Sequence, residues 1–486
     1  MLFWVFAIQP LAAKDHNILA FGAVADGTTL NTTAIQKAID AAHANGGGRV
    51  IIPQGKFLSG TIELRTGVEL HLEKGAVLLG STNVKHYRKI NRWMALVMAD
   101  HADNIAITGQ GTLDGQGAAL ALSIDSLFYI GEIDSSRYKF PEMRPKAQLR
   151  PQVIELVDCR NVRVTGVTVK DAACWVQTFE RCQNLVIDSI RVESDAYWNN
   201  DGIDISDCRN VRITNCYVNS ADDGICLKSH SKDASFICDS IYIANCTVRS
   251  SASAVKFGSA SFGGFRNVVI ENIKVFDTFR SAIAIESVHG GVLEDILVQN
   301  IEATNTGNAI FIRIGKRWRN RPAGQLRNVV IRNIRVEVPF ERMDYGYEIR
   351  GPELPFFHNV FPASITGLPG IPVQNVTLEN IEITYPGRGN KAYAYLPLSR
   401  LDAIPELPEA YPEFSMFGEL PAWGLYARHV EGLTLKGLKL RIKAPDYRPV
   451  MVFDDVKGLT VKGLEVKGDN KPNPIVLHNS AGAVIE

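Results

Sequence analysis

Three aspartates in two neighbouring runs of the sequence could carry out acid–base chemistry together. Asp201 stands in the run NNDGIDIS, and Asp222 and Asp223 stand in the run DDGICLK. Carboxylates held close together repel one another, so the pKa of at least one rises and it can stay protonated near neutral pH. An inverting glycosidase needs such a protonated carboxyl group, with its acid and base about 6.5–9.5 Å apart to leave room for water.

Each Asp-Gly pair also has a plainer interpretation, because aspartate before glycine is common in turns. Two such pairs in register on adjacent strands, one of them preceded by a second aspartate, favour catalysis over turn formation. Asp204 lies further along its strand, and we expect it only to support the turn.

Five short runs between residues 201 and 313 predict the strands that position these aspartates. Each run alternates apolar with other residues, which is typical of a strand with one buried face. If successive runs stack as neighbouring parallel strands, equivalent residues lie about 4.8 Å apart. Asp201 and Asp223 then share one outer corner, with Asp222 beside them. The two predicted inward columns are Ile203, Ile225, Val255, Ile283 and Ile310, and Ile205, Leu227, Phe257, Ile285 and Ile312.

A longer repeat, seen in runs such as NVRVTGVTV and NVVIENIKV, extends through most of the 486 residues. Its period lies within the range of roughly 20–50 residues that is typical of solenoids and propellers. The repeat contains strand patterns and no helical periodicity. We therefore predict an all-β chain folded as a single right-handed parallel β-helix, with residues 14–486 as one domain.

A helix is predicted before the first strands. Asn31 or Thr32 can cap its start, and glycines 46–48 can end it. At this place it would cover the open end of the stacked sheet. Its predicted apolar face consists of Ala34, Ile35, Ala38, Ile39 and Ala42.

Three long insertions interrupt the repeat, within residues 104–161, 328–375 and 375–432. We expect loops here rather than domains, and structured loops of such length commonly carry function. If they project beside the aspartates, they close one end of a cleft and the enzyme acts from chain ends. The alternative is that they only cover exposed sheet.

The two aspartate runs resemble motifs of glycoside hydrolase family 28, the polygalacturonases. The run Asn199–Asp204 is similar to the Asn-Thr-Asp-Gly motif of that family, and Asp222-Asp223 to its paired aspartates. The resemblance covers nearly the whole chain and implies a pectin-lyase-like solenoid. It also implies that Asp222 is the general acid, that Asp201 and Asp223 activate the water, and that Asn199 helps to bind the substrate.

The resemblance implies hydrolysis of a pectic or other acidic plant polysaccharide or its oligosaccharides. We expect no cofactor and no metal, because a protonated acid and a base are sufficient for hydrolysis. Two alternatives remain open. A polysaccharide lyase would use a basic residue such as Lys256, often with calcium held by aspartates, whereas a carbohydrate-binding β-helix would catalyse nothing.

Two family motifs are altered in this chain, which leaves the sugar open. Ala252-Ser253-Ala254 stands where Gly-His-Gly is expected, and the Arg-Ile-Lys motif becomes Arg313-Ile314-Gly315 followed by Lys316. In the family these basic residues hold the carboxylate of galacturonate. Further basic and aromatic side chains near the strands could replace them, whereas His230 and His289 are expected to be ordinary surface histidines. The candidate substrate-binding residues are Asn199, Trp198, Lys228, Lys256, Arg313 and Lys316.

Composition excludes some partners. Lysine and arginine together number 52, as do aspartate and glutamate, so no overall charge attracts nucleic acid or a membrane. Residues 1–13 are apolar but shorter than the roughly 20 residues of a membrane span. We interpret them as the remainder of a signal peptide, although a buried strand is an alternative. We expect an exported monomer, either periplasmic or extracellular.

All eight cysteines lie between Cys159 and Cys246, and six of them recur at two positions of the repeat. Cys159, Cys182, Cys208 and Cys238 share one position, and Cys216 and Cys246 share the other. This spacing predicts columns of small buried side chains. Bridging would be possible in an oxidising compartment. We favour free, buried thiols.

Overall fold

The computed structural model describes residues 14–232 and 235–486, and the contacts divide the chain into two compact units. Unit 1 comprises Met1–Ala173 and Cys182–Arg191, and unit 2 comprises Cys174–Arg181 and Val192–Glu486. The proposed signal remainder at residues 1–13 lies outside the described residues. The single domain stays a prediction. Within the described part of the chain, no helix has the length and apolar character of a membrane span.

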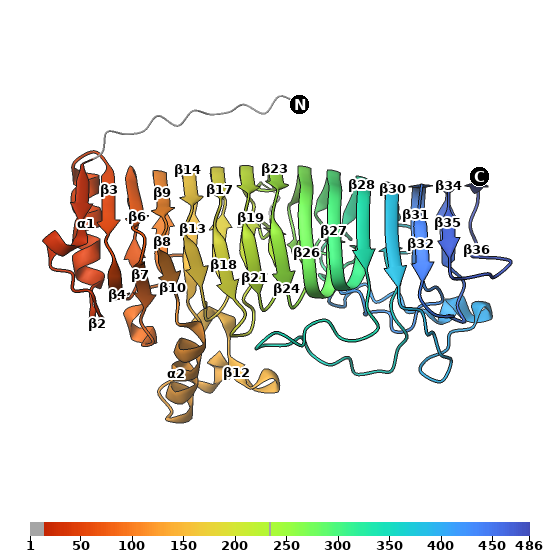
Figure 1. Ribbon diagram of the computed structural model, residues 1–486, viewed down its shortest axis with the longest axis horizontal. Coiled ribbons are helices and arrows are strands. Elements are labelled where there is room, and N and C mark those ends of the chain that lie inside the picture. Colours follow the sequence, from red (N-terminus) through yellow and green to blue (C-terminus); the bar gives the residue numbers. More distant parts are fainter. Residues whose placement is uncertain (1–13, 233–234) are drawn as a thin grey trace. The chain divides into compact units, whose positions relative to one another are not determined.

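Each unit consists mainly of parallel strands that lie side by side (Figure 1). One turn of the chain forms a rung, and the strands of successive rungs pair with one another. In unit 1, β14 (Arg160–Thr165) pairs in parallel with β9 (Asp103–Gly109) and β17 (Gln183–Asp188). Unit 2 has the same parallel pairing, and two of its strands are longer than 20 residues. The predicted all-β class and the parallel β-helix fold are confirmed.

Asparagine at the start of many repeats has a structural role in turning the chain between strands. In unit 1, Asn161 donates from its side chain to Asn104, and Asn184 donates to Asn161, both at 2.9 Å. All three have a positive φ, near +54°, a conformation that asparagine tolerates better than most residues. Stacked amides therefore tie successive corners together.

The five predicted runs of unit 2 form neighbouring strands in the predicted register. Ile203 lies opposite Ile225, Ile225 opposite Val255, and so on to Ile310. These residues are buried in the core. The strands are β19 (Ile203–Ser206), β22 (Ile225–Ser229), β25 (Val255–Ser261), β26 (Gly264–Ser287) and β27 (Val292–Ile314).

Helix α1 (Thr32–Ala44) confirms the predicted helix near the start of unit 1 (Figure 1). Its buried face contacts β1 (Asp15–Asn17) and β3 (Gly48–Ile52). Asn31 is the N-cap residue, as predicted, but its side chain makes no capping hydrogen bond to the helix. It accepts a hydrogen bond from the Val24 amide at 2.7 Å instead. The buried residues of the helix are Ile35, Ala38, Ile39 and Ala42.

The insertions differ from one another. Residues 104–161 contain α2 (Gly117–Tyr129), which the loop prediction missed. In unit 2, residues 338–362 follow β28 (Gln325–Glu337), and residues 386–424 follow β30 (Val373–Tyr385); neither insertion contains a strand. Figure 1 shows both as loops below the strand ends of unit 2. Apolar side chains of both insertions pack in one buried cluster with strand residues Ala284, Phe311 and Tyr426; the loop members include Phe361, Leu401, Phe414 and Phe417.

The cysteines confirm the prediction of free thiols, since all eight are unbridged and buried. In unit 2, Cys208 and Cys238 immediately precede residues paired on adjacent strands, Arg209 and Asp239. The thiols are therefore stacked core residues of the repeat.

Candidate active site

Asp201 and Asp223 occupy equivalent positions on adjacent rungs, as predicted. The Gly202 amide donates to the carbonyl of Asp223 at 2.8 Å, and the Gly224 amide donates to that of Ser253 at 2.9 Å. The side chains of Asp201, Asp223 and Ser253 therefore belong to one polar column, and each residue is buried. Ser253 also donates from its amide to the Asp223 carboxylate at 3.2 Å.

The glycines after these aspartates allow neighbouring rungs to approach closely. A Cβ at Gly202 would lie 2.4 Å from the side chain of Val218 and 2.7 Å from the carbonyl oxygen of Gly224. A Cβ at Gly224 would lie 2.4 Å from Val248 and 2.6 Å from the carbonyl oxygen of Ala254. The Asp-Gly pairs are thus required by packing between rungs, which the turn interpretation did not include.

Asp222 is the most exposed of the three aspartates, since it is half-buried while the other two are buried. Its carboxylate accepts from the Asp223 amide at 3.0 Å and from the Asn199 side chain at 3.3 Å. Asn199 thus contacts the candidate acid, and the next residue, Asn200, anchors the motif by donating to the carbonyl of Cys174 at 2.7 Å. A group that transfers a proton to a bound sugar needs this access to the surface.

Lys228 lies between two buried carboxylates. Its ammonium is 2.7 Å from Asp201 and 2.8 Å from Asp204, and it donates to the sulfur of Cys226 at 3.1 Å. Burial raises the pKa of Asp201 well above its usual value, and the negative charges of its aspartate neighbours add to this rise against the opposing charge of Lys228. Burial also raises the pKa of Asp204 to about 6. Asp204 is therefore part of the charge network and does more than support a turn.

Asp223 lies in the opposite electrostatic environment. Its carboxylate is 3.0 Å from the Lys256 ammonium. Burial alone would raise the pKa of Asp223, but the charges of Lys256, Lys228 and Arg280 outweigh burial and lower it below its usual value. These cations therefore favour the ionised form of Asp223.

Two residues near Asp223 were missed by the sequence analysis. The Lys256 ammonium donates to the hydroxyl of Tyr411 at 2.9 Å and lies 3.9 Å from the carboxylate of Glu286. Burial raises the pKa of Glu286 to about 8. Glu286 could have been noticed as an acidic residue in an otherwise apolar run. Tyr411 had no such signal, because it comes from the loop at residues 386–424.

Two arginines lie against the ring of Tyr411. The guanidinium groups of Arg280 and Arg317 lie 5.6 and 5.2 Å from the centre of its ring. Arg280 is also 3.5 Å from Glu413 of the same loop. These arginines, which the sequence analysis did not select, bring positive charge next to the aspartates.

Lys228, Lys256 and Arg313 do not lie where a substrate-binding role was expected. The two lysines are buried against the candidate carboxylates Asp201 and Asp223, so they hold those groups instead of reaching into solvent. Arg313 is only 1% exposed, and it donates to the carbonyl oxygens of Gly367, at 3.0 Å, and Glu406. Burial lowers its pKa to about 10. Arg313 therefore ties the loop to the strands.

Lys316 and two tryptophans are the remaining residues to place. Lys316 is half-buried, and its amide donates to the carbonyl of Pro408 at 2.7 Å. Trp198 is half-buried beside Asn199, whereas Trp175 covers the Lys228 ammonium at 4.7 Å. His289 is not the surface residue predicted: it is 6% exposed and its ring stacks on Phe262.

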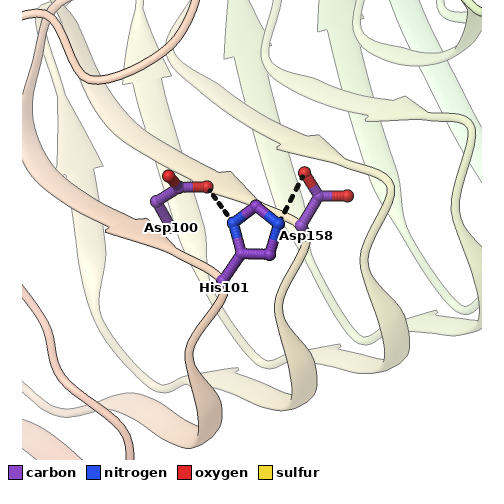
Figure 2. Close-up of side chains that lie close together, drawn as sticks. All are labelled: Asp100, His101 and Asp158. Carbon is purple, nitrogen blue, oxygen red and sulfur yellow. Dashed lines mark hydrogen bonds and ion pairs between the residues drawn. The ribbon is translucent and has the colours of Figure 1, made fainter.

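Two clusters of described residues have ligand atoms close enough to hold a metal ion. Asp201, Asp204 and Cys226 form one, but the Lys228 ammonium already lies within hydrogen-bond distance of all three. The other consists of Asp100, His101 and Asp158 in unit 1 (Figure 2). His101 faces Asp100 at 2.8 Å and Asp158 at 3.8 Å, and its side chain is 75% exposed. This arrangement is that of a surface ion pair when the histidine is protonated.

Comparisons with known proteins place the sequence among carbohydrate-active enzymes. The sequence model described as "Glycosyl hydrolases family 28" matches residues 44–341. An "Exo-poly-alpha-D-galacturonosidase" from Dickeya chrysanthemi is 28% identical over 306 residues, covering 53% of this chain and 50% of that protein. A "Probable polygalacturonase" from Vitis vinifera is 24% identical over 322 residues, covering 62% of this chain and 57% of its own. The chain thus spans about half the length of these curated relatives.

A solved structure agrees with the fold. The hyperthermoactive exopolygalacturonase from Thermotoga maritima superposes with a TM-score of 0.61 at 25% identity. The superposition covers 76% of this chain and 87% of the Thermotoga chain. The likeness therefore extends beyond the residues of the family match.

Proposed function

This chain belongs to glycosyl hydrolases family 28, and we propose that it hydrolyses a uronate-containing pectic polysaccharide, or its oligosaccharides, with inversion. The match confirms the predicted family, and the matched residues 44–341 include Asn199–Asp204 and Asp222-Asp223. The observation that carries the proposal is the arrangement of the carboxylates: a half-buried Asp222 beside an ionised Asp223, with Asp201 on the adjacent rung.

In the proposed mechanism Asp222 donates a proton to the glycosidic oxygen as the bond to the leaving sugar breaks. Asp223 takes a proton from the attacking water, and Asp201 holds that water with it. The lowered pKa of Asp223 supports its role as the base, because the group is then ionised at the pH of the reaction. Lys256 maintains this charge, which makes it a positioning residue.

The substrate class is supported by charge near the site and by the names of the relatives. Arg280 and Arg317 flank Tyr411 beside Asp223, and guanidinium groups suit the carboxylate of a uronate. The Dickeya and Thermotoga proteins are named for activity on galacturonan. We therefore propose galacturonan, or a related uronate polymer, as the substrate.

We also propose that the enzyme acts from chain ends. The loop at residues 386–424 brings the hydroxyl of Tyr411 to Lys256, next to Asp223, and a loop at this place would close one end of the cleft. Galacturonan digestion should release mono- or disaccharides from the start, without a rapid fall in viscosity. An early fall in viscosity would contradict the exo assignment, and an unsaturated, ultraviolet-absorbing product would identify a lyase.

Replacement of the acid tests the mechanism. Asp222→Asn should lower kcat by about 10²–10⁴-fold, because general acid catalysis contributes that much, and the melting temperature should stay within a few degrees. The matched control is Asp295→Asn. Asp295 is exposed, and its carboxylate accepts a hydrogen bond from the side chain of Asn328, a contact that asparagine can also make. Near-normal turnover in Asp222→Asn would remove Asp222 from the acid role.

A further inference from the structure

A pocket with aromatic walls lies between the two long loops of unit 2. Its volume is about 600 Å³, within the range of roughly 300–1,000 Å³ that is usual for ligand sites. Four of its aromatic side chains are unusually exposed: Phe340 (44%), Phe356 (37%), Phe357 (79%) and Tyr393 (49%). A contiguous exposed apolar patch of this kind typically marks a binding site.

The pocket adjoins the residues that surround the catalytic carboxylates. Phe279 and Phe414 form part of its wall, with ring centres 6.3 Å apart. The residues next to them in sequence, Arg280 and Glu413, form the ion pair beside Tyr411. The charge of Arg280 acts on Asp222 and Asp223. A polymer whose reacting sugar lies at these aspartates would therefore have neighbouring sugars near the pocket.

The charges around the pocket do not suit a uronate. Among the described lining residues, Arg342 is the only arginine or lysine. Its guanidinium is paired with Asp344, at 2.6 Å, and with Glu353, at 2.8 Å. Glu341 adds a further negative charge to the lining, and Arg388 lies over the ring of Phe340 at 4.9 Å. A carboxylate entering the pocket would thus meet Glu341, Glu353 and the already paired Arg342, because Arg388 is not a lining residue and lies against the ring of Phe340.

We propose that this pocket binds a neutral sugar ring of the polysaccharide, next to the uronate that is cleaved. The C–H face of a neutral sugar can stack on the rings of Phe340, Phe356 and Tyr393, and its hydroxyl groups can donate to Glu341 and Glu353. An aliphatic or purely aromatic ligand could donate no hydrogen bond to those carboxylates. The inference rests on the proposed function, since it makes the preferred substrate a pectic chain in which neutral sugars accompany uronates.

Binding measurements test the pocket independently of catalysis. The probes are β-1,4-galactobiose, which is neutral, and digalacturonate, which is charged, each titrated calorimetrically into the full-length protein. We expect Phe340→Ala/Phe356→Ala to weaken galactobiose binding at least tenfold and to leave digalacturonate binding unchanged. Tyr345→Ala is the matched control, because Tyr345 is 66% exposed in the same loop and does not line the pocket. It should change neither affinity.

Several outcomes would overturn the inference. These are no binding of galactobiose to the unaltered protein, equal binding by the double variant, or equal weakening of both probes. A concentration-dependent dimer that the double variant abolishes would assign the surface to a second copy of the chain instead. Phe357→Ala, at the most exposed pocket position, guards against misfolding of the double variant and should also weaken galactobiose binding.

Hydrolysis separates failure of this inference from failure of the proposed function. On unbranched galacturonan the double variant should keep the kcat and KM of the unaltered protein, whereas on galactan-branched rhamnogalacturonan its KM should rise about tenfold. Equal KM changes on both substrates would overturn the pocket assignment. An unaltered protein that binds galactobiose through the pocket but hydrolyses neither polymer would overturn the hydrolase proposal and uphold the pocket as a neutral-sugar site.

Discussion

At the scale of single residues, the candidate active site depends on two buried lysines. Lys228 is shared by Asp201 and Asp204, and Lys256 by Asp223 and Glu286. A buried charge without a partner strongly destabilises the folded state. Each ammonium therefore reduces the free-energy cost of burying its carboxylates. Burial raises the pKa of Asp201, whereas at Asp223 the charges of Lys256, Lys228 and Arg280 outweigh burial and lower the pKa.

Glu286 provides a test of this charge balance through stability. Its folded-state pKa of about 8 lies above the ordinary glutamate value of 4.5, so the folded state binds a proton more tightly than the unfolded state. The stability that this proton contributes is present below pH 4.5 and is lost as pH rises toward 8. Each pKa unit corresponds to about 1.4 kcal/mol. Glu286→Gln removes the titration and should raise the melting temperature relative to the natural protein.

The gain from Glu286→Gln should be a few degrees at pH 8.5 and smaller at pH 5.5, as measured by thermal unfolding monitored by circular dichroism. Glu302→Gln, at an exposed position on β27, is the control and should show no such pH-dependent gain. An equal gain at both pH values would contradict the raised pKa.

At the scale of elements, strands β19 and β22 position the carboxylates because the rungs meet closely where each strand begins. Gly202 leaves space for the side chain of Val218, and Gly224 leaves space for that of Val248. Backbone hydrogen bonds between the rungs then set Asp201 directly against Asp223. The geometry of the site is therefore a property of rung stacking, and it is sensitive to one added methyl group.

Gly224→Ala should lower kcat/KM at least tenfold and destabilise the protein by about 1–3 kcal/mol, as overpacked cores do. The added Cβ would lie 2.4 Å from Val248 and 2.6 Å from the Ala254 carbonyl oxygen, so the chain at Asp222-Asp223 must move. The control is Gly346→Ala, whose nearest neighbour is the flexible end of Arg249 at 3.2 Å. Activity assays and thermal unfolding measure both effects; an unchanged Gly224→Ala would show that the rungs can relax.

At the scale of the whole chain, the same rung chemistry recurs from one end of the described sequence to the other. Asparagine ladders tie corners together in both units, for example Asn161 with Asn104 in unit 1 and Asn333 with Asn300 in unit 2. Cys208 and Cys238 likewise occupy equivalent buried positions on adjacent rungs of unit 2. Stability is therefore distributed over many similar contacts between neighbouring rungs.

Because all eight cysteines are free and buried, reduction should not affect the protein. We expect dithiothreitol at roughly 5 mM, which breaks accessible disulfides, to have no effect. The melting temperature and the activity should both stay unchanged. A fall of several degrees would reveal a disulfide, since loss of a native bridge commonly costs about 2–5 kcal/mol. Thiol titration in denaturant should count eight free groups.

The sequence by itself determined the strands, their register and the meeting of Asp201 with Asp223, because adjacent rungs repeat the same apolar spacing and stacking turns that spacing into contacts. It also indicated Asp222 and the free thiols. It could not place Tyr411 against Lys256, bury Arg313 under the loop, or assemble the aromatic pocket from residues 338–362 and 386–424. Those contacts join residues that are far apart in the chain and carry no periodic signal, so only the packing of the loops onto the strands of unit 2 decided them.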